Sequence, residues 1–334
     1  MKRMKMIGII LLVALPLSVF AAGQKDAKPT NEVVHYRLAT IQPPDSPVGK
    51  AALKFAELVK EKSAGTVLID VYPASQLGNE KDIIDGVEMG TIDFTIAGTA
   101  EWAKRLKMMK IFEAPFVYRN RDHLVKFYGS DAGKEVLQEL TKKTGVKSLG
   151  FLYYGTRDVT TGKVPAKTPA ELNGVKLRCP DQPLYVQTVK AMGATPTPMA
   201  FSEVYLALQQ GTVDGQENPP ATIVTMKFHE VQKYLIKTEH IVAGVMIWTK
   251  DAFIAKMPKS RQDAIIAAAN EASVWANEYS FKMEDEYLTK MGKEYGMTII
   301  EPDKQAFMNA AQALLDTYEQ EWGPGLLAKV RAVK

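Results

Sequence analysis

Five segments near the start of the chain alternate between strand and helix patterns, and this alternation limits the possible folds more than any other feature. Hydrophobic stretches typical of β-strands lie at 35–44, 66–75 and 92–98. Amphipathic helix patterns occupy 46–65 and 79–91 between them. A β-α-β-α-β order predicts a parallel sheet with helices on both faces.

The rest of the chain continues the alternation. Further strands are predicted at 146–155, 174–180, 213–220 and 238–253, and further helices at 130–145, 183–193, 202–212, 221–235, 260–296 and from Lys304 onward. Ser202 is predicted to cap the N-terminus of its helix. Two α/β units of this kind predict an α/β fold with two lobes around a cleft. Ligands of such sheets bind beyond the carboxyl ends of the strands, where Arg178 and Asn218 lie.

The N-terminus has the pattern of a secretory signal peptide. A basic start is followed by an apolar run at 7–20 and then by small residues, so we place cleavage after Ala21 or Ala22. A transmembrane anchor is the alternative, but the run falls short of the roughly 20 apolar residues that a span needs. No cysteine lies near the cleavage site to carry a lipid. The sequence predicts a signal peptide (1–22), a flexible leader (23–32) and a periplasmic protein without direct membrane insertion.

Charge and cysteine content narrow the classes of function. The formal net charge of the 334 residues is +4, and Lys2, Arg3 and Lys5 of the signal peptide contribute three of these charges, which leaves +1. This charge argues against a nucleic-acid partner, because binding to nucleic acid usually requires a strongly basic patch. The only cysteine, Cys179, excludes an internal disulfide and is predicted to be a buried apolar side chain rather than a nucleophile.

Short motifs of catalysis and of cofactor or metal binding are absent from the sequence. It contains no G-x-G-x-x-G, P-loop, H-E-x-x-H or G-x-S-x-G, and its four histidines lack metal-ligand spacing. We therefore expect binding rather than catalysis, with no cofactor and no metal. The clearest candidate for a binding residue is Arg178, at the end of the strand pattern GVKLRCP. It lies either on a solvated face of that strand or in a cleft where it can bind an anion.

Four segments carry a family resemblance. The run KLRCPDQPLYVQTVKAMGATPTPMAFSEVYLALQQGTVDGQENPP at 176–220 is the most specific, and YPASQLGNEKDIIDGVEMGTIDF, EAPFVYRNRDH and GTRDVTTGK precede it in the expected order. Over essentially the whole mature chain, the sequence resembles the solute-binding proteins of tripartite ATP-independent periplasmic (TRAP) transporters. The resemblance implies a binding protein, not an enzyme, whose two lobes close on one organic acid and deliver it to a membrane permease.

The resemblance also implies the domain organisation. We expect one lobe to comprise 33–154 with 243–282 and the other to comprise 155–242 with 283–334. A long C-terminal helix is expected to brace both lobes.

Individual ligand-binding residues follow from the same resemblance. Arg178 matches the arginine that pairs with the ligand carboxylate, and a guanidinium suits this task because its two parallel hydrogen bonds fix orientation as well as charge. Arg157 matches a second basic position, and Asn218 matches a polar ligand contact. Phe201 matches an aromatic position near the ligand, and Asn79 matches a polar residue at the edge of the cleft.

One departure from the family pattern concerns the identity of the ligand. The sialic-acid branch has a glutamate and then an arginine where this chain has Gly98 and Glu101. A carboxylate at Glu101 would repel a second ligand carboxylate, so we expect a uronic or other sugar acid. Glu101 is alternatively an exposed residue at a helix start.

Three other functions remain open from the sequence. The same fold would serve a C4-dicarboxylate or a 2-oxo acid. A sensor subunit with this fold is a second alternative, and an exported enzyme acting on acidic sugars is a third.

Overall fold

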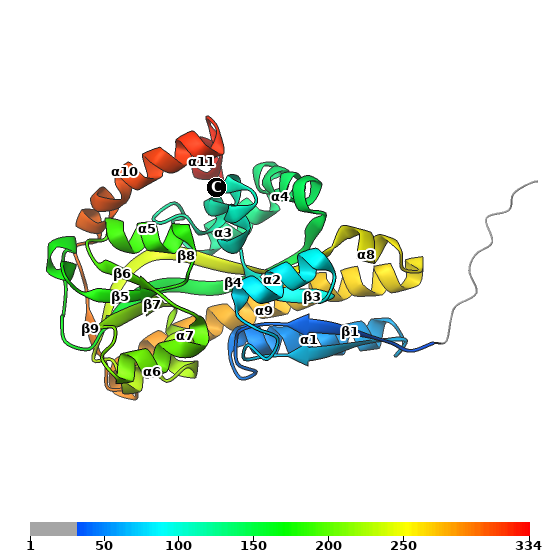
Figure 1. The fold of residues 1–334 in the computed structure, drawn as a ribbon, viewed down its shortest axis with the longest axis horizontal. Helices are drawn as coiled ribbons and strands as arrows, with labels where there is room; N and C mark the ends of the chain where they lie inside the picture. The colour runs from blue at the N-terminus through cyan, green and yellow to red at the C-terminus, as the bar shows by residue number, and fades with distance from the viewer. Residues whose placement is uncertain (1–31) are drawn as a thin grey trace, which may run out of the picture. The chain divides into compact units, whose positions relative to one another are not determined.

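A nine-stranded mixed sheet runs through residues 32–334, the part of the chain that the computed structural model describes (Figure 1). The strand order is β2-β1-β3-β8-β4-β7-β5-β6, and β9 pairs with β8 outside this path. The predicted signal peptide (1–22) and all of the predicted leader except Glu32 lie outside the described residues. The predicted α/β class is confirmed.

The strands are β1 (Val34–Ala39), β2 (Val67–Tyr72), β3 (Phe94–Gly98), β4 (Val146–Thr161), β5 (Lys176–Cys179), β6 (Thr195–Pro198), β7 (Gly215–Asn218), β8 (Tyr234–Lys250) and β9 (Thr298–Ile300). The α-helices are α1 (Pro47–Lys62), α2 (Glu80–Met89), α3 (Arg121–Gly129), α4 (Asp131–Thr144), α5 (Pro183–Ala191), α6 (Val204–Gln209), α7 (Pro220–Thr225), α8 (Asp251–Ala255), α9 (Lys259–Lys293), α10 (Lys304–Trp322) and α11 (Leu326–Ala332). Short 3₁₀ helices are η1 (Glu101–Lys104), η2 (Lys107–Glu113), η3 (Pro169–Leu172), η4 (Phe201–Glu203) and η5 (Phe228–Glu230).

The first five elements follow the predicted β-α-β-α-β order. β1 pairs in parallel with β2 on one side and with β3 on the other. The hydroxyl of Ser46 accepts a hydrogen bond from the amide of Gly49 and so caps α1. Asn79 and Asp82 form a capping box at the start of α2, and Gly90 ends that helix in the left-handed conformation.

Two long antiparallel strands, β4 and β8, form the centre of the sheet (Figure 1). One part of this pair lies beside β3, and another lies beside β7. The register shifts between Tyr153 and Gly155, in the middle of β4. Gly155 has φ 138°, and a Cβ there would stand 2.4 Å from Cβ of Pro219. This position therefore needs glycine both for its conformation and for the close approach of another segment.

The helix α9 lies along α1 and β4 and supports the irregular part of β4. Its buried alanines pack against α1 and β4 in a cluster that includes Phe55 and Leu152. Asn277 accepts a hydrogen bond from the amide of Tyr153 at 2.6 Å, and Glu284 accepts one from the amide of Thr156 at 2.6 Å. These side chains provide acceptors for backbone amides on both sides of the register shift.

Several local predictions were wrong. The strand predicted at 238–253 begins earlier, at Tyr234, and its last three residues, 251–253, belong to α8. Ser202 does not cap a helix, because the chain first forms η4 and α6 then begins after Glu203 without a side-chain cap. The predicted helix at 221–235 is only α7 and η5, since Tyr234 already belongs to β8. The boundaries of the two lobes stay a prediction. Two of them fall on β4 and β8 near the pair formed by Gly155 and Ala243, and the third, after residue 282, falls within α9.

Candidate functional site

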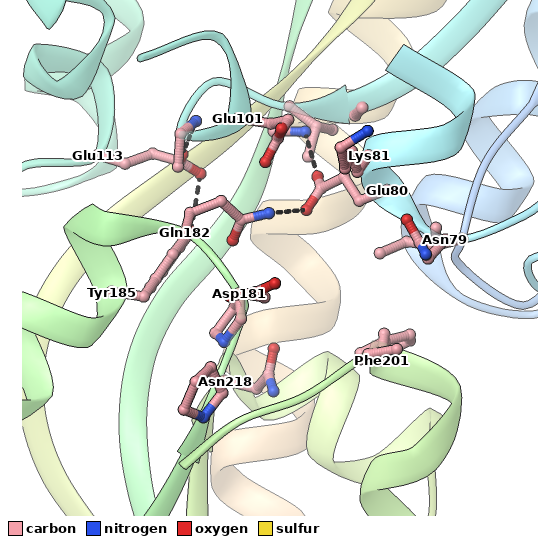
Figure 2. A pocket seen from close by; sticks show the side chains of 18 of the residues that line it. Asn79, Glu80, Lys81, Glu101, Glu113, Asp181, Gln182, Tyr185, Phe201 and Asn218 are labelled. Atoms are coloured by element: carbon pink, nitrogen blue, oxygen red, sulfur yellow. Dashed lines mark hydrogen bonds between the residues drawn. The ribbon is translucent and has the colours of Figure 1, made fainter. Parts of the chain in front are cut away.

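A cavity of about 200 Å³ lies beside the carboxyl ends of β3, β5 and β7 (Figure 2). One wall comes from α2, β3, η1 and η2, and the other comes from β4, β5, β7 and η4. All six candidate ligand-binding residues line this cavity: Asn79, Glu101, Arg157, Arg178, Phe201 and Asn218. Residues spread over 140 positions of the sequence, from 79 to 218, are thus brought to one place.

Arg178 ends the buried strand β5 and is only 2% exposed, so the interpretation that places it on a solvated face is wrong. Its Nη2 donates to the carbonyl oxygen of Met199 at 2.8 Å. Its Nε and Nη1 have no hydrogen-bond partner among residues 32–334. Burial lowers the pKa of this guanidinium to about 10, although Glu217 acts in the opposite direction. Buried donors without acceptors are costly, so Arg178 is a ready partner for an acceptor that a ligand brings.

Arg157, on β4, already has a partner within the protein. Its Nε and Nη2 donate to the two carboxylate oxygens of Glu217 at 2.5 and 2.8 Å, and its guanidinium lies 4.8 Å from the ring centroid of Tyr185. His240 Nε2 lies 3.1 Å from the same carboxylate. Burial alone would raise the pKa of Glu217, but Arg157 and His240 lower it to about 2. The pair of Arg157 and Glu217 therefore adds little net charge to the cavity.

Asn218 and Phe201 lie on the wall that also carries Arg178. Asn218, at the end of β7, donates to Gln216 at 2.6 Å and accepts from the hydroxyl of Tyr154 at 3.3 Å. Phe201 begins η4 and is 8% exposed. The wall thus combines a polar amide with an apolar ring.

Asn79 and Glu101 lie on the opposite wall. Asn79 is exposed at the edge of the cavity, and its side chain caps α2. Glu101 does start a helix, but it is 1% exposed, so the alternative of an exposed residue is wrong. It pairs with Lys104 Nζ at 2.8 Å and with Arg105 Nη1 at 3.3 Å. These two cations offset its charge.

The lining residues that were not predicted include a polar group of four: Glu80, Glu113, Gln182 and Tyr185. Figure 2 shows them clustered beside Glu101, with Asn218 and Phe201 at the other end of the view. Glu80 accepts from the amide of Gly98 at 2.9 Å and from Gln182 Nε2 at 3.1 Å. Glu113 accepts from the amide of Ala100 at 2.7 Å and from the hydroxyl of Tyr185 at 3.0 Å.

Neither of these two glutamates has a cationic partner within 4.0 Å in the described part of the chain. Burial raises the pKa of both carboxyls, that of Glu113 to about 7. In the sequence, Glu80 resembles an ordinary acidic residue of a first helical turn, and Glu113 stands in the apolar run KIFEAPF. No sequence signal therefore distinguished them.

The arrangement is suited to holding a small anion rather than to catalysis through a metal. Within residues 32–334, no three His, Cys, Asp or Glu side chains are grouped to hold a metal ion. No helix in the same range is long and apolar enough to cross a membrane. Cys179 is buried, as predicted, and burial raises the pKa of its thiol to about 12.

Comparison with known proteins assigns the chain and its fold to a family. Residues 38–321 match the model of the bacterial extracellular solute-binding protein, family 7. A solute-binding protein of Roseobacter denitrificans is 35% identical over 280 residues, which are 82% of this chain and 84% of that protein.

Two solved TRAP periplasmic solute-binding proteins show the same fold. One from Citrobacter koseri, with bound D-glucuronate, superposes with a TM-score of 0.85 at 30% identity and covers 90% of this chain and 100% of its own. One from Sulfurospirillum deleyianum, with bound succinate, gives a TM-score of 0.84 at 30% identity, covering 90% and 99%. The chain belongs to family 7 of the bacterial extracellular solute-binding proteins, the solute-binding proteins of TRAP transporters.

Proposed function

We propose that this protein captures a sugar acid in the periplasm and delivers it to the permease of a TRAP transporter, without catalysis. The carboxylate of the ligand pairs with Arg178, and Asn218 contacts a hydroxyl or carbonyl group beside it. Phe201 packs against the carbon chain of the ligand. Arg157, whose charge Glu217 largely offsets, presents a second guanidinium beside the ligand, and Asn79 and Glu101 close the opposite side.

The observation that supports this proposal most strongly is the state of Arg178. Its guanidinium is buried, faces the cavity and keeps Nε and Nη1 unpaired among the described residues. A ligand carboxylate supplies the missing acceptors. Breaking a buried ion pair by removing one partner costs about 3–5 kcal/mol, which corresponds to a loss of affinity on the order of 10²–10³-fold.

Lobe closure accompanies binding in this proposal. The two walls of the cavity come from residues assigned to different lobes, and side chains already join them. Gln182 donates to Glu80 at 3.1 Å, and the hydroxyl of Tyr185 donates to Glu113 at 3.0 Å. A ligand that contacts both walls favours the closed state by its additional contacts.

A short diacid is the second candidate ligand, because the related protein from Sulfurospirillum deleyianum contains succinate. The carboxylates on the wall opposite Arg178 favour the sugar acid. Hydroxyl groups can donate to these carboxylates, whereas a second ligand carboxylate is repelled by them.

Thermal melting of the mature protein against a panel of acids tests the proposal. The panel contains glucuronate, galacturonate, several aldonates, sialate, malate, succinate and 2-oxo acids. A ligand at 100 times its Kd adds about 2.7 kcal/mol, a shift of about 5–10 °C for a protein of this size. We expect such a shift with a sugar acid, and we expect Arg178→Ala to abolish it.

Arg37→Ala is the matched control, because Arg37 is exposed and does not line the cavity. A shift only with diacids or 2-oxo acids would reject the sugar acid. Equal affinity of wild type and Arg178→Ala for the same acid would reject Arg178 as the residue that binds the ligand carboxylate. Conversion of a bound acid to a new product, followed by NMR, would reject the absence of catalysis.

A further inference from the structure

The wall opposite Arg178 carries more acceptors than the protein can satisfy, once Gln182 is included, which reaches across from the Arg178 side and donates to Glu80 at 3.1 Å. Gln182 Oε1 and Gln42 Oε1 are buried oxygens without a hydrogen-bond donor among residues 32–334, and both residues line the cavity. They are 4% and 6% exposed. Buried acceptors left without donors are costly, so a ligand with donor groups on this side gains affinity from them.

Two carboxylates stand in the same wall. A Cβ placed on Gly98 would lie 3.2 Å from Glu80 Oε1 and 3.3 Å from Glu113 Oε1, so the two carboxylates flank the same glycine of β3. Their partners within the protein are neutral donors: the amides of Gly98 and Ala100, the side chains of Gln182 and Thr99, and the hydroxyl of Tyr185.

The other carboxylates of the cavity region differ from this pair. Glu101 has Lys104 and Arg105 as partners, and Glu217 has Arg157. Asp181 also lines the cavity, but it is exposed to water. Among the less exposed carboxylates, the charges of Glu80 and Glu113 are therefore the ones left for a ligand to meet.

We infer that Glu80 and Glu113, together with the side-chain oxygens of Gln182 and Gln42, select a ligand with one carboxylate and with hydroxyl donors at its other end. A second carboxylate at that end is excluded. This inference rests on the proposed function and narrows it, because it separates aldonic and uronic acids from the diacids of the same carbon skeleton. It assigns the selection to these acceptors, here called the acceptor wall, rather than to the arginine anchor.

The physical reason is the difference between a hydroxymethyl and a carboxylate group at one ligand position. A hydroxyl donates to a carboxylate and so satisfies both partners. A carboxylate has no proton to donate, and it brings a like charge into a site with low exposure to water, where such repulsion is strong. Arg157 can offset little of this repulsion, because two of its three guanidinium nitrogens already bind Glu217.

Calorimetric titration of the mature protein at pH 8, where Glu113 with its pKa of about 7 is mostly ionised, tests the selection with two matched pairs of acids. The pairs are D-gluconate with D-glucarate and D-galactonate with galactarate, in which only the terminal carbon differs. We expect wild type to bind the preferred aldonate at least about 100-fold more tightly than its diacid. Glu80→Gln and Glu113→Gln keep the shape and one oxygen but remove the charge, and each is expected to reduce this ratio at least tenfold.

Asp158→Asn serves as the control, because Asp158 is buried but does not line the cavity, and it should leave the ratio unchanged. Glu80 is only partly buried, so Glu80→Gln remains informative if Glu113→Gln does not fold. Similar affinity of wild type for both members of a pair, or an unchanged ratio in both glutamate variants, would overturn the selection and leave the proposed function intact. Failure of wild type to bind any sugar acid would overturn the proposed function and this inference with it.

Discussion

At the scale of single residues, buried charges in the cavity fall into two groups. Glu217 and Glu101 have cationic partners. Among the described residues, Arg178 has no anionic partner and Glu113 has no cationic partner. The first group is stabilised by the protein itself. The second group destabilises the empty protein, and a ligand can recover that cost on binding. Binding sites commonly contain such groups with shifted pKa values.

Glu113 makes the stability of the empty protein depend on pH. Burial raises its pKa from 4.5 to about 7, the charge of Glu80 acts in the same direction, and Arg157 opposes them. Between these two pKa values the folded state binds more protons than the unfolded state. The free energy of unfolding therefore falls as the pH rises from about 4.5 to 7, by on the order of 3 kcal/mol in total. Urea unfolding at several pH values should show this slope, and it should be shallower in Glu113→Gln.

Asp158 provides the comparison for that experiment. Burial raises its pKa to about 8, so it acts in the same direction but over a window that reaches higher pH. Asp158→Asn should therefore keep the part of the pH dependence of the free energy of unfolding that Glu113 contributes. Parallel pH profiles for wild type and Glu113→Gln would contradict the role of Glu113.

At the scale of secondary-structure elements, β4 is where the sequence was least informative. The predicted strand ended at Gly155, because a glycine there resembles the end of a strand. The structure continues β4 to Thr161 through the register shift, since β8 supplies hydrogen-bond partners along its whole length. Pairing with a strand some 90 positions away leaves no local signal. Elements with a regular apolar period and local caps, such as α1 and α2, were predicted correctly.

Gly155→Ala should destabilise the protein more than a positive φ alone explains. A φ of 138° is already unfavourable for alanine, and the added Cβ would lie 2.4 Å from Pro219. Gly145→Ala is the control, because Gly145 has φ 72° and its added Cβ would meet nothing within 4 Å. We expect Gly145→Ala to cost about 1 kcal/mol and Gly155→Ala to cost about 3 kcal/mol or more, measured by urea unfolding. Equal costs would show that the segment of Pro219 moves away freely.

At the scale of the whole molecule, sequence and structure contributed different parts of the cavity. The residues at strand ends, Arg178 and Asn218, follow from the topology of α/β sheets and from the family pattern. The acceptor wall does not, because in the sequence Glu80 resembles an ordinary helix-start residue and Glu113 interrupts an apolar segment. Their proximity depends on how α2 and η2 meet the end of β3, where Glu80 accepts from the amide of Gly98 and Glu113 accepts from the amide of Ala100. No short sequence pattern specifies this arrangement.

The continuity of β4 and β8 predicts how the whole molecule unfolds. These strands pair from Val146 with Lys250 to Thr161 with Tyr234, so the same hydrogen-bonded ladder serves both predicted lobes. Loss of one part of the ladder exposes the backbone of the other part, which favours a single cooperative transition. Three tryptophans belong to one hydrophobic cluster, Trp102, Trp248 and Trp322, and the fourth, Trp275, packs against a second. No tryptophan belongs to the two clusters around β5, β6 and α6 in residues 32–334.

Tryptophan fluorescence therefore reports on one part of the described molecule, and far-UV circular dichroism reports on all of it. We expect the two signals to give the same urea midpoint, and a ligand at 100 times its Kd to raise both equally. Separate midpoints would contradict a single transition and would show that the two lobes unfold independently despite the strands they share. In that case, a ligand bound between the lobes should bring the two midpoints together, because only the joined state offers both walls of the cavity.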